Sequence, residues 1–213
     1  MKRSTGLLTL ALVGAALAAS ACGSVRPIYY YSLDPPAVTP AADKLDVSLV
    51  IGRIGAPLVY RDTRIVYRIG PNEMGLYQDH RWAEAPAELV QEMVFQSLRR
   101  SKRYKSVQLI SSNVRGDYVL RGRVDRFEEV DNPLSSRVWM HFSLYDPTQG
   151  KTVWSQDYQN DAPVSAKEVS AVAASLNQNL QQGITQILGG LDQYLTANPK
   201  PPTSAAGPSS GGR

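Results

Sequence analysis

The chain has 213 residues but only one cysteine, Cys22, and two histidines, His80 and His141. A single cysteine excludes an internal disulfide bond and a metal site built from several thiolates. The sequence also lacks a glycine-rich phosphate loop, an HExxH pair and a GxSxG turn. We therefore expect no metal, no cofactor and no enzymatic activity. A hydrolase stays open as an alternative, because a triad of serine, histidine and acid assembles in space rather than in sequence.

Long hydrophobic runs are missing too. The longest, from Leu7 to Ala19, has 13 residues, and a helix needs about 20 to span a bilayer. Lys2 and Arg3 precede this run and small residues follow it, which is the order of a secretory signal peptide. We therefore expect residues 1–21 to be a signal peptide rather than part of the fold.

Cys22 comes directly after these small residues. Its position resembles the lipobox of bacterial lipoproteins, whose cysteine receives a diacylglyceryl group and becomes the new N-terminus, although Ala19 stands where leucine is usual. Acyl chains contribute about 0.8 kcal/mol per buried methylene, so a lipidated Cys22 would hold the chain on a membrane. Gly23, rather than aspartate, resembles the default sorting signal for the outer membrane. An ordinary cleaved signal peptide or a chance cysteine is the alternative.

The charge is small, and the two ends of the chain differ from its centre. Cleavage before Cys22 would remove two basic residues and no acid, which lowers the net charge from +4 to +2 and argues against a nucleic-acid partner. Proline-rich residues 34–43 predict a loop, and the Pro, Gly and Ser composition of residues 197–213 predicts a disordered tail. We expect a lipidated linker at 22–43 and a single domain at 44–196.

Alternating apolar and polar residues predict strands through most of the chain. The clearest is a hairpin in "SSRVWMHFSLYDPTQGKTVWSQDYQ", in which Val138, Met140, Phe142 and Leu144 share one face and "DPTQG" forms the turn. The other strands are expected at residues 29–33, 45–51, 64–69, 74–78, 105–110 and 117–130.

Two segments have the three-to-four spacing of amphipathic helices. The first runs from Pro86 to Ser101, and the second, much longer, runs from about Ser165 to Leu195, with a kink or break expected at Gly189–Gly190. The predicted fold is therefore α+β, with a predominantly antiparallel, possibly mixed sheet and both helices packed on one of its faces. Part of the long apolar stripe could instead pack on a neighbouring subunit.

Residues 57–98, "PLVYRDTRIVYRIGPNEMGLYQDHRWAEAPAELVQEMVFQSL", carry a resemblance to a known family. Together with "YYYSL" at 29–33, the lipobox and "YVLRGRVDRFEEV" at 118–130, they are similar to the auxiliary lipoproteins of ABC-type transport systems, which include the PqiC-type lipoproteins. The likeness covers about residues 26–195. No single motif in it is strong, and the ordered set carries the resemblance.

The resemblance implies a location and partners. Such proteins sit on the periplasmic face of the outer membrane, work with an MCE-domain protein and an inner-membrane transport component to move lipids across the periplasm, and can form homo-oligomeric rings that meet the end of an MCE tube. A lipid-binding lipoprotein with its own pocket is the main alternative, and a lipoprotein hydrolase using His80 or His141 is the other.

Arginine and aromatic residues are enriched at interface hot spots, and they gather in the segment that carries the resemblance. We expect an interface there, although Trp82 could equally close the core. The candidate residues are Tyr60, Arg61, Arg64, Arg68, His80, Arg81 and Trp82.

Overall fold

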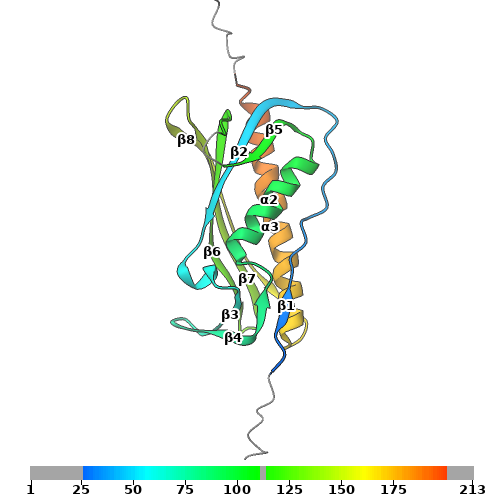
Figure 1. Cartoon of the computed structure of the whole chain (residues 1–213), viewed down its shortest axis with the longest axis vertical. Helices are drawn as coiled ribbons and strands as arrows, with labels where there is room; N and C mark the ends of the chain where they lie inside the picture. Colours follow the sequence, from blue (N-terminus) through cyan, green and yellow to red (C-terminus); the bar gives the residue numbers. More distant parts are fainter. Residues whose placement is uncertain (1–25, 111–113, 201–213) are drawn as a thin grey trace, which may run out of the picture.

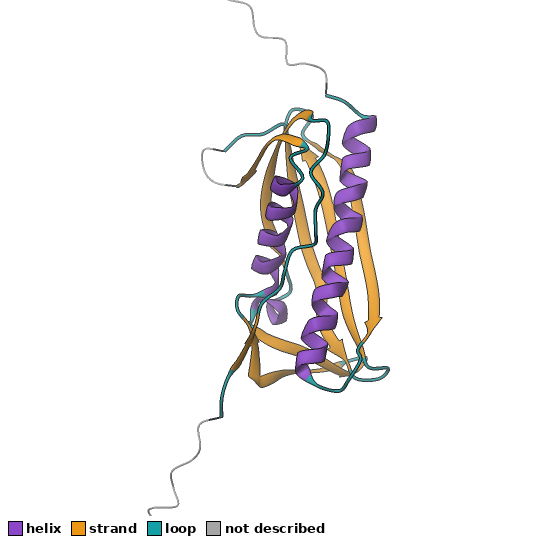
Figure 2. Cartoon of the chain, turned by 90° about the vertical axis from the view of Figure 1, so that its right-hand side faces the viewer, coloured by secondary structure: helices purple, strands orange, loops and turns teal. Residues whose placement is uncertain are grey.

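A computed structural model describes residues 26–110 and 114–200. The predictions for the signal peptide, for Cys22 and for most of the C-terminal tail lie outside the described residues. The described chain forms a mixed eight-stranded sheet with two helices on one face (Figures 1 and 2). This confirms the α+β class.

Each predicted strand and helix is present, with bounds shifted by a few residues. Strand β4 is longer than expected, because pairing with β3 and β1 extends it to Trp82. The strands are β1 (Tyr29–Tyr31), β2 (Leu45–Gly55), β3 (Arg64–Gly70), β4 (Glu73–Trp82), β5 (Tyr104–Leu109), β6 (Tyr118–Val130), β7 (Ser135–Asp146) and β8 (Lys151–Pro163), and the helices are the 3-10 helix η1 (Leu58–Arg61), α2 (Pro86–Arg100) and α3 (Val169–Ala197).

Strand β6 is the centre of the sheet because both of its edges are paired. One edge pairs antiparallel with β7, which pairs antiparallel with β8. The other edge is divided between β2, which pairs with its first half, and β3, which pairs with residues 128–130. Outside these, β5 adds to β2, β4 adds to β3, and β1 adds to β4.

The expected predominance of antiparallel pairing is wrong. Four of the seven strand pairs are parallel, so the mixed sheet that we allowed is the one present. The cause lies in the chain path: β2 and β3 follow one another along the same edge of β6 in the same direction, with η1 between them. No chain reversal separates these two strands, so both run parallel to β6.

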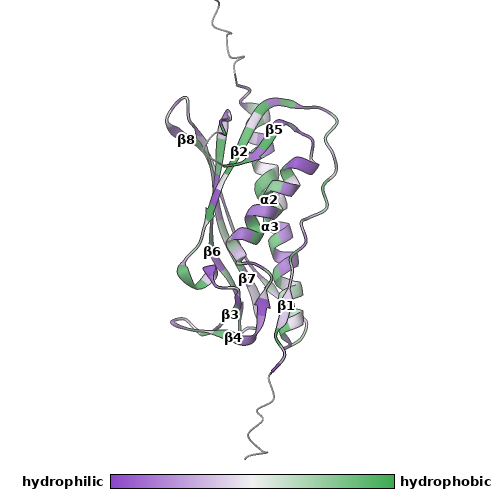
Figure 3. Ribbon diagram, in the orientation of Figure 1, coloured by the Kyte–Doolittle hydropathy of each residue, from purple (hydrophilic) through white to green (hydrophobic). Residues whose placement is uncertain are grey.

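Both helices bury their apolar stripe against the sheet. Pro86 begins α2 at the position where a missing N–H costs nothing, and Val90, Val94 and Leu98 face the core. In α3 the buried side chains recur every three or four residues, while the outer surfaces of both helices stay polar (Figure 3). The buried apolar residues of the α3 stripe are Val172, Leu176, Leu180, Ile184, Ile187, Leu191 and Leu195.

Helix α3 passes very close to the β7–β8 hairpin at Gly183. A Cβ on this residue would lie 2.6 Å from Cδ1 of Tyr158 and 2.8 Å from Cε of Met140. Tyr158 is held in place, because it is buried and its hydroxyl donates to Oδ1 of Asn179 at 2.7 Å. Because it has no side chain, Gly183 therefore lets α3 lie close against the β7–β8 hairpin.

Helix α3 runs continuously over 29 residues (Figure 2), so the break expected at Gly189–Gly190 is wrong. Burial of the long apolar stripe outweighs the low helix propensity of these glycines.

Two alanine substitutions in α3 separate packing from helix propensity. Alanine is about 1 kcal/mol more favourable than glycine in a helix, and a Cβ on Gly189 would meet no atom within 4 Å. We expect Gly189→Ala to raise the free energy of unfolding by up to about 1 kcal/mol, whereas Gly183→Ala lowers it by about 1 to 3 kcal/mol through overpacking. Urea unfolding of both variants measures this, and equal stabilisation by both would contradict the close approach at Gly183.

Candidate functional site

Two of the predicted interface residues meet a buried carboxylate on β6. Glu128 is fully buried, and Arg68 on β3 donates to both of its oxygens, from Nε at 2.7 Å and from Nη2 at 3.0 Å. The hydroxyl of Tyr60 in η1 also donates to Glu128, at 2.6 Å. Arg137 on β7 lies 3.8 Å from the same carboxylate. Glu128 therefore joins η1, β3, β6 and β7 at one point.

This network is structural. Burial, followed by the hydrogen bond to Glu128, raises the pKa of Tyr60 well above its usual value, so the phenol remains a donor. The hydrogen bond to Glu128 likewise raises the pKa of Arg68. A charge is buried at low cost only where it is paired and hydrogen-bonded, and both requirements are met here. Tyr60 and Arg68 are thus part of the folded interior, as is Trp82, which is 1% exposed and packs on Phe127.

His80 lies in an aromatic cluster that connects β1 to β4. Its ring stacks on Tyr29 and Tyr31, at centroid distances of 5.0 and 5.8 Å, and meets the edge of Tyr77. The hydroxyl of Tyr31 and Nδ1 of His80 are 2.9 Å apart and share a hydrogen bond. His80 therefore holds the short strand β1 on the sheet.

We call Arg64 and Arg81, together with Arg61, which is three positions before Arg64 in the chain, the arginine cluster. Arg64 and Arg81 stand directly opposite one another on β3 and β4, an arrangement that like charges disfavour. Asp62 partly offsets it: Nη2 of Arg64 lies 2.7 Å from Asp62 Oδ2, and this hydrogen bonding lowers the pKa of Asp62 to about 2. Nε of Arg81 is buried and has no hydrogen-bond partner among the described residues. The cluster thus keeps positive charge that the described part of the chain does not neutralise.

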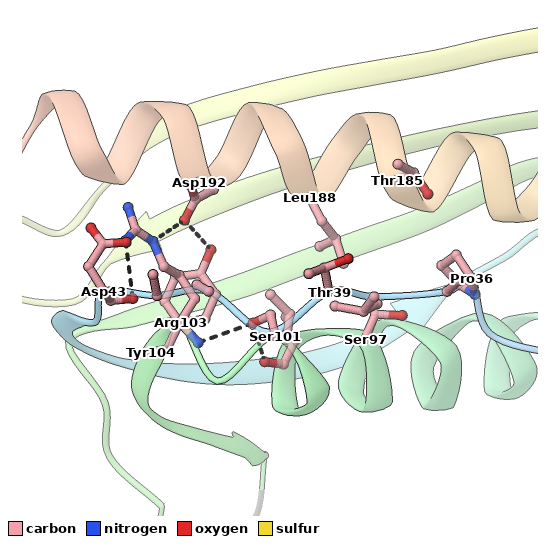
Figure 4. A pocket seen from close by; sticks show the side chains of 15 residues that line it. Pro36, Thr39, Asp43, Ser97, Ser101, Arg103, Tyr104, Thr185, Leu188 and Asp192 are labelled. Carbon is pink, nitrogen blue, oxygen red and sulfur yellow. Dashed lines mark hydrogen bonds and ion pairs between the residues drawn. The ribbon is translucent and has the colours of Figure 1, made fainter.

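A cavity of about 440 Å³ lies between α2, α3 and the loop of residues 34–43, which we call the strap (Figure 4). Leu98, Leu188 and Pro36 give it apolar walls. The hydroxyls of Ser97 and Thr185, which also line it, already donate to helix carbonyls at 2.7 and 2.8 Å. The interior therefore offers little unsatisfied hydrogen-bonding capacity.

One end of this cavity is charged. Nε of Arg103 donates to Oδ1 of Asp192 at 2.8 Å, and Asp43 of the strap pairs with the same guanidinium (Figure 4). The hydrogen bond from Arg103 lowers the pKa of Asp43, while burial and the charge of Asp192 raise the pKa of Tyr104. An apolar interior with a charged mouth suits an amphiphilic ligand.

The strap is attached only at its ends. The Asp34 N–H donates to Oδ1 of Asn177 at 3.0 Å, its carbonyl accepts from Gln181 at 2.9 Å, and the Ala41 N–H donates to the carbonyl of Ser101 at 2.8 Å. No hydrogen bond joins residues 35–40 to the rest of the described chain. This middle part covers the cavity through packing alone.

The histidines show no assembled catalytic group. Nδ1 of His141 lies 2.7 Å from Asp157 on the sheet face opposite the helices, and no serine in residues 26–110 and 114–200 is bonded to His141 or His80. The same residues contain no cluster of three potential metal ligands. In that part of the chain, neither helix combines the length and apolar character needed to cross a membrane.

Sequence reasoning missed Glu128, Arg103 and the cavity. One signal for Glu128 was available: two adjacent acids lie between Phe127 and Val130 in a strand, and acidic residues are rarely buried unless paired. The cavity had no comparable signal, because its walls come from three segments far apart in the chain.

Together these features define an α+β protein with an amphipathic cavity and a cationic, aromatic end. The chain belongs to the family described as the ABC-type transport auxiliary lipoprotein component, whose model matches residues 31–188. This confirms the resemblance found in the sequence. A search of curated proteins finds no significant match.

Solved structures share the fold at low sequence identity. Protein XCC0632 from Xanthomonas campestris, of the DUF330 family, is 23% identical with a TM-score of 0.68, and the match covers 78% of this chain and 99% of that one. A second uncharacterised protein is 13% identical with a TM-score of 0.61 over the same shares. A PelC dodecamer from Paraburkholderia phytofirmans is 17% identical, with 72% and 94% covered, and has a TM-score of only 0.45.

The buried network gives a stability prediction. We expect Glu128→Ala to lower the free energy of unfolding by about 3 to 5 kcal/mol, because Arg68 is left buried without its partner. The control is Asp125→Ala, which removes an ion pair with Arg123 whose side chains are 40% and 52% exposed, and which should cost at most about 1 kcal/mol. Chemical denaturation measures both, and a similar small loss in each variant would contradict the structural role of Glu128.

Proposed function

We propose that this protein is a non-enzymatic lipoprotein on the periplasmic face of the outer membrane, and an auxiliary component of an MCE-type lipid transport system. In this proposal it docks on the tube of an MCE-domain protein, works with an inner-membrane transport component, and assembles as a ring of identical copies. The family match over residues 31–188 carries the proposal, because it identifies an auxiliary lipoprotein of ABC-type transport.

The geometry supports a role in docking. Arg61, Arg64, His80 and Arg81 are the candidate interface residues that keep solvent exposure in the described chain, and we propose that they belong to its interaction surface. Tyr60, Arg68 and Trp82 support this surface from beneath, because they are buried behind it. The tightly packed core gives such a surface a fixed shape.

The anchor can be tested at Cys22. We expect Cys22→Ala to leave a folded protein that no longer fractionates with the outer membrane and does not restore function in a strain lacking the gene. Envelope fractionation and circular dichroism measure location and fold, and Cys22→Ala produced with its leader removed serves as the soluble reference.

The partner can be tested by purification. We expect the native lipoprotein, purified from envelope, to recover an MCE-domain protein. Absence of an MCE-domain protein from a crosslinked purification would remove the support for the transport role.

The cavity favours a second candidate function, a lipid-binding module with its own pocket. Its volume of about 440 Å³ lies within the range of small-molecule sites. A diacyl phospholipid is larger than the drug-sized ligands that such volumes hold, so a single-chain amphiphile, such as a fatty acid or lysophospholipid, is the better fit.

Filling the cavity tests this second function. We expect native mass spectrometry of the isolated protein to show a bound single-chain lipid, and we expect Leu188→Trp to abolish it because the larger side chain occupies the cavity. Leu89→Trp is the matched control, since Leu89 is also a partly buried helical leucine but does not line the cavity. A protein that is free of lipid, or a lipid retained equally by both variants, would argue against a ligand in this cavity.

A further inference from the structure

Exposed large hydrophobic side chains gather at one end of the molecule. Of the seven in the described chain, only Ile110 lies elsewhere. The other six belong to β1 and the residue before it, to η1, and to the β3–β4 hairpin, which lie together at the lower end of Figure 1. We call this the anchor end; its exposed residues are Ile28, Tyr29, Tyr30, Leu58, Ile69 and Met74, with exposures of 46, 52, 66, 82, 50 and 41%.

The chain enters the fold at this same end. The first described residue, Arg26, comes three positions before β1, and β1 lies in the lower part of Figure 1. Arg26 is four positions after Cys22 in the sequence, and an extended chain covers at most about 3.6 Å per residue, or about 14 Å here. A lipid on Cys22 would therefore keep Arg26, where the chain enters the anchor end, within about 14 Å of the bilayer surface.

We propose that the anchor end rests in the headgroup layer of the membrane that holds the lipid anchor. This inference rests on the lipidation of Cys22 in the proposed function and adds an orientation to it. Tyrosine is enriched at membrane–water interfaces because its ring is apolar and its hydroxyl is polar, and Tyr29 and Tyr30 have that character. An exposed apolar group such as Leu58 gains by leaving water at the same boundary.

The charge of the anchor end fits phospholipid phosphates. Tyr30, Arg81 and Arg64 occupy paired positions across β1, β4 and β3, so they share one face of the sheet, and strand alternation places it opposite the buried Trp82. Arginine binds phosphate through charge-assisted hydrogen bonds, and Arg64 and Arg81 are both partly exposed. A lipid phosphate would add a second anion beside Asp62, so in this orientation the interaction surface that contains Arg64 and Arg81 meets the membrane.

The depth of single tryptophans in a membrane tests this orientation. The lipidated full chain is reconstituted into vesicles of phosphatidylethanolamine and phosphatidylglycerol that contain phospholipids brominated near the headgroup. Tyr30→Trp and Leu58→Trp place a probe at the anchor end, and Ile110→Trp places one at the exposed hydrophobic residue outside it. The unmodified chain supplies the background fluorescence of its own three tryptophans.

We expect bromolipid to quench the added fluorescence of Tyr30→Trp and Leu58→Trp and to shift it to shorter wavelength, while the added fluorescence of Ile110→Trp is unchanged. If all variants float with the vesicles but none is quenched, the chain is anchored and the orientation is wrong. A blue shift that depends on protein concentration and not on bromolipid would assign the anchor end to a second copy and overturn the inference. A chain that does not float would refute the anchor itself, and with it both proposals.

Discussion

The structure depends on the divided edge of β6. Two successive parallel strands, β2 and β3, pair with one edge of this strand, and the gap between them has to be filled without leaving polar groups unpaired. Helix η1 fills it, and its Tyr60 joins Arg68 in bonding to the buried Glu128. The placement of β3 determines that of β4 and β1, which extend outward from it. The buried carboxylate therefore fixes the position of the aromatic, cationic end of the molecule relative to its helical core.

The sequence predicted which residues face the core better than it predicted which strands pair. Alternation identified the strand faces, and the buried face of the β7–β8 hairpin follows Val138, Met140 and Phe142 as expected. Alternation says nothing about the neighbour of a strand, so the parallel pairing of β2 and β3 with β6 could not be read from it. The break expected at Gly189–Gly190 failed for a related reason: glycine has low helix propensity, but burial of the α3 stripe against the sheet, a contact between distant parts of the chain, keeps the helix continuous.

The predicted interface residues divide according to their depth in the fold. Residue type placed them in one group, because arginine and aromatic side chains serve interfaces and buried networks alike. Only the structure separates Tyr60, Arg68 and Trp82, which stabilise the interior, from Arg61, Arg64 and Arg81, which keep solvent exposure at its edge. The acidic partner that decides this, Glu128, is about 60 residues away in sequence from Arg68. Interior and surface members of the group remain coupled, since β3 carries both Arg64 and Arg68.

The route of the chain links β1 to the cavity. From Arg26 the chain forms β1, which is held to β4 by three paired residues and by the stacking of Tyr29 and Tyr31 on His80. It then becomes the strap, which is bonded to α3 at Asp34 and to the end of α2 at Ala41, and which covers the cavity between these helices. A ligand large enough to lift the strap has to break packing contacts of residues 35–40 while the two attachment points hold. Strand β1 and the roof of the cavity therefore belong to one continuous segment, so a displacement of β1 is transmitted directly to the strap.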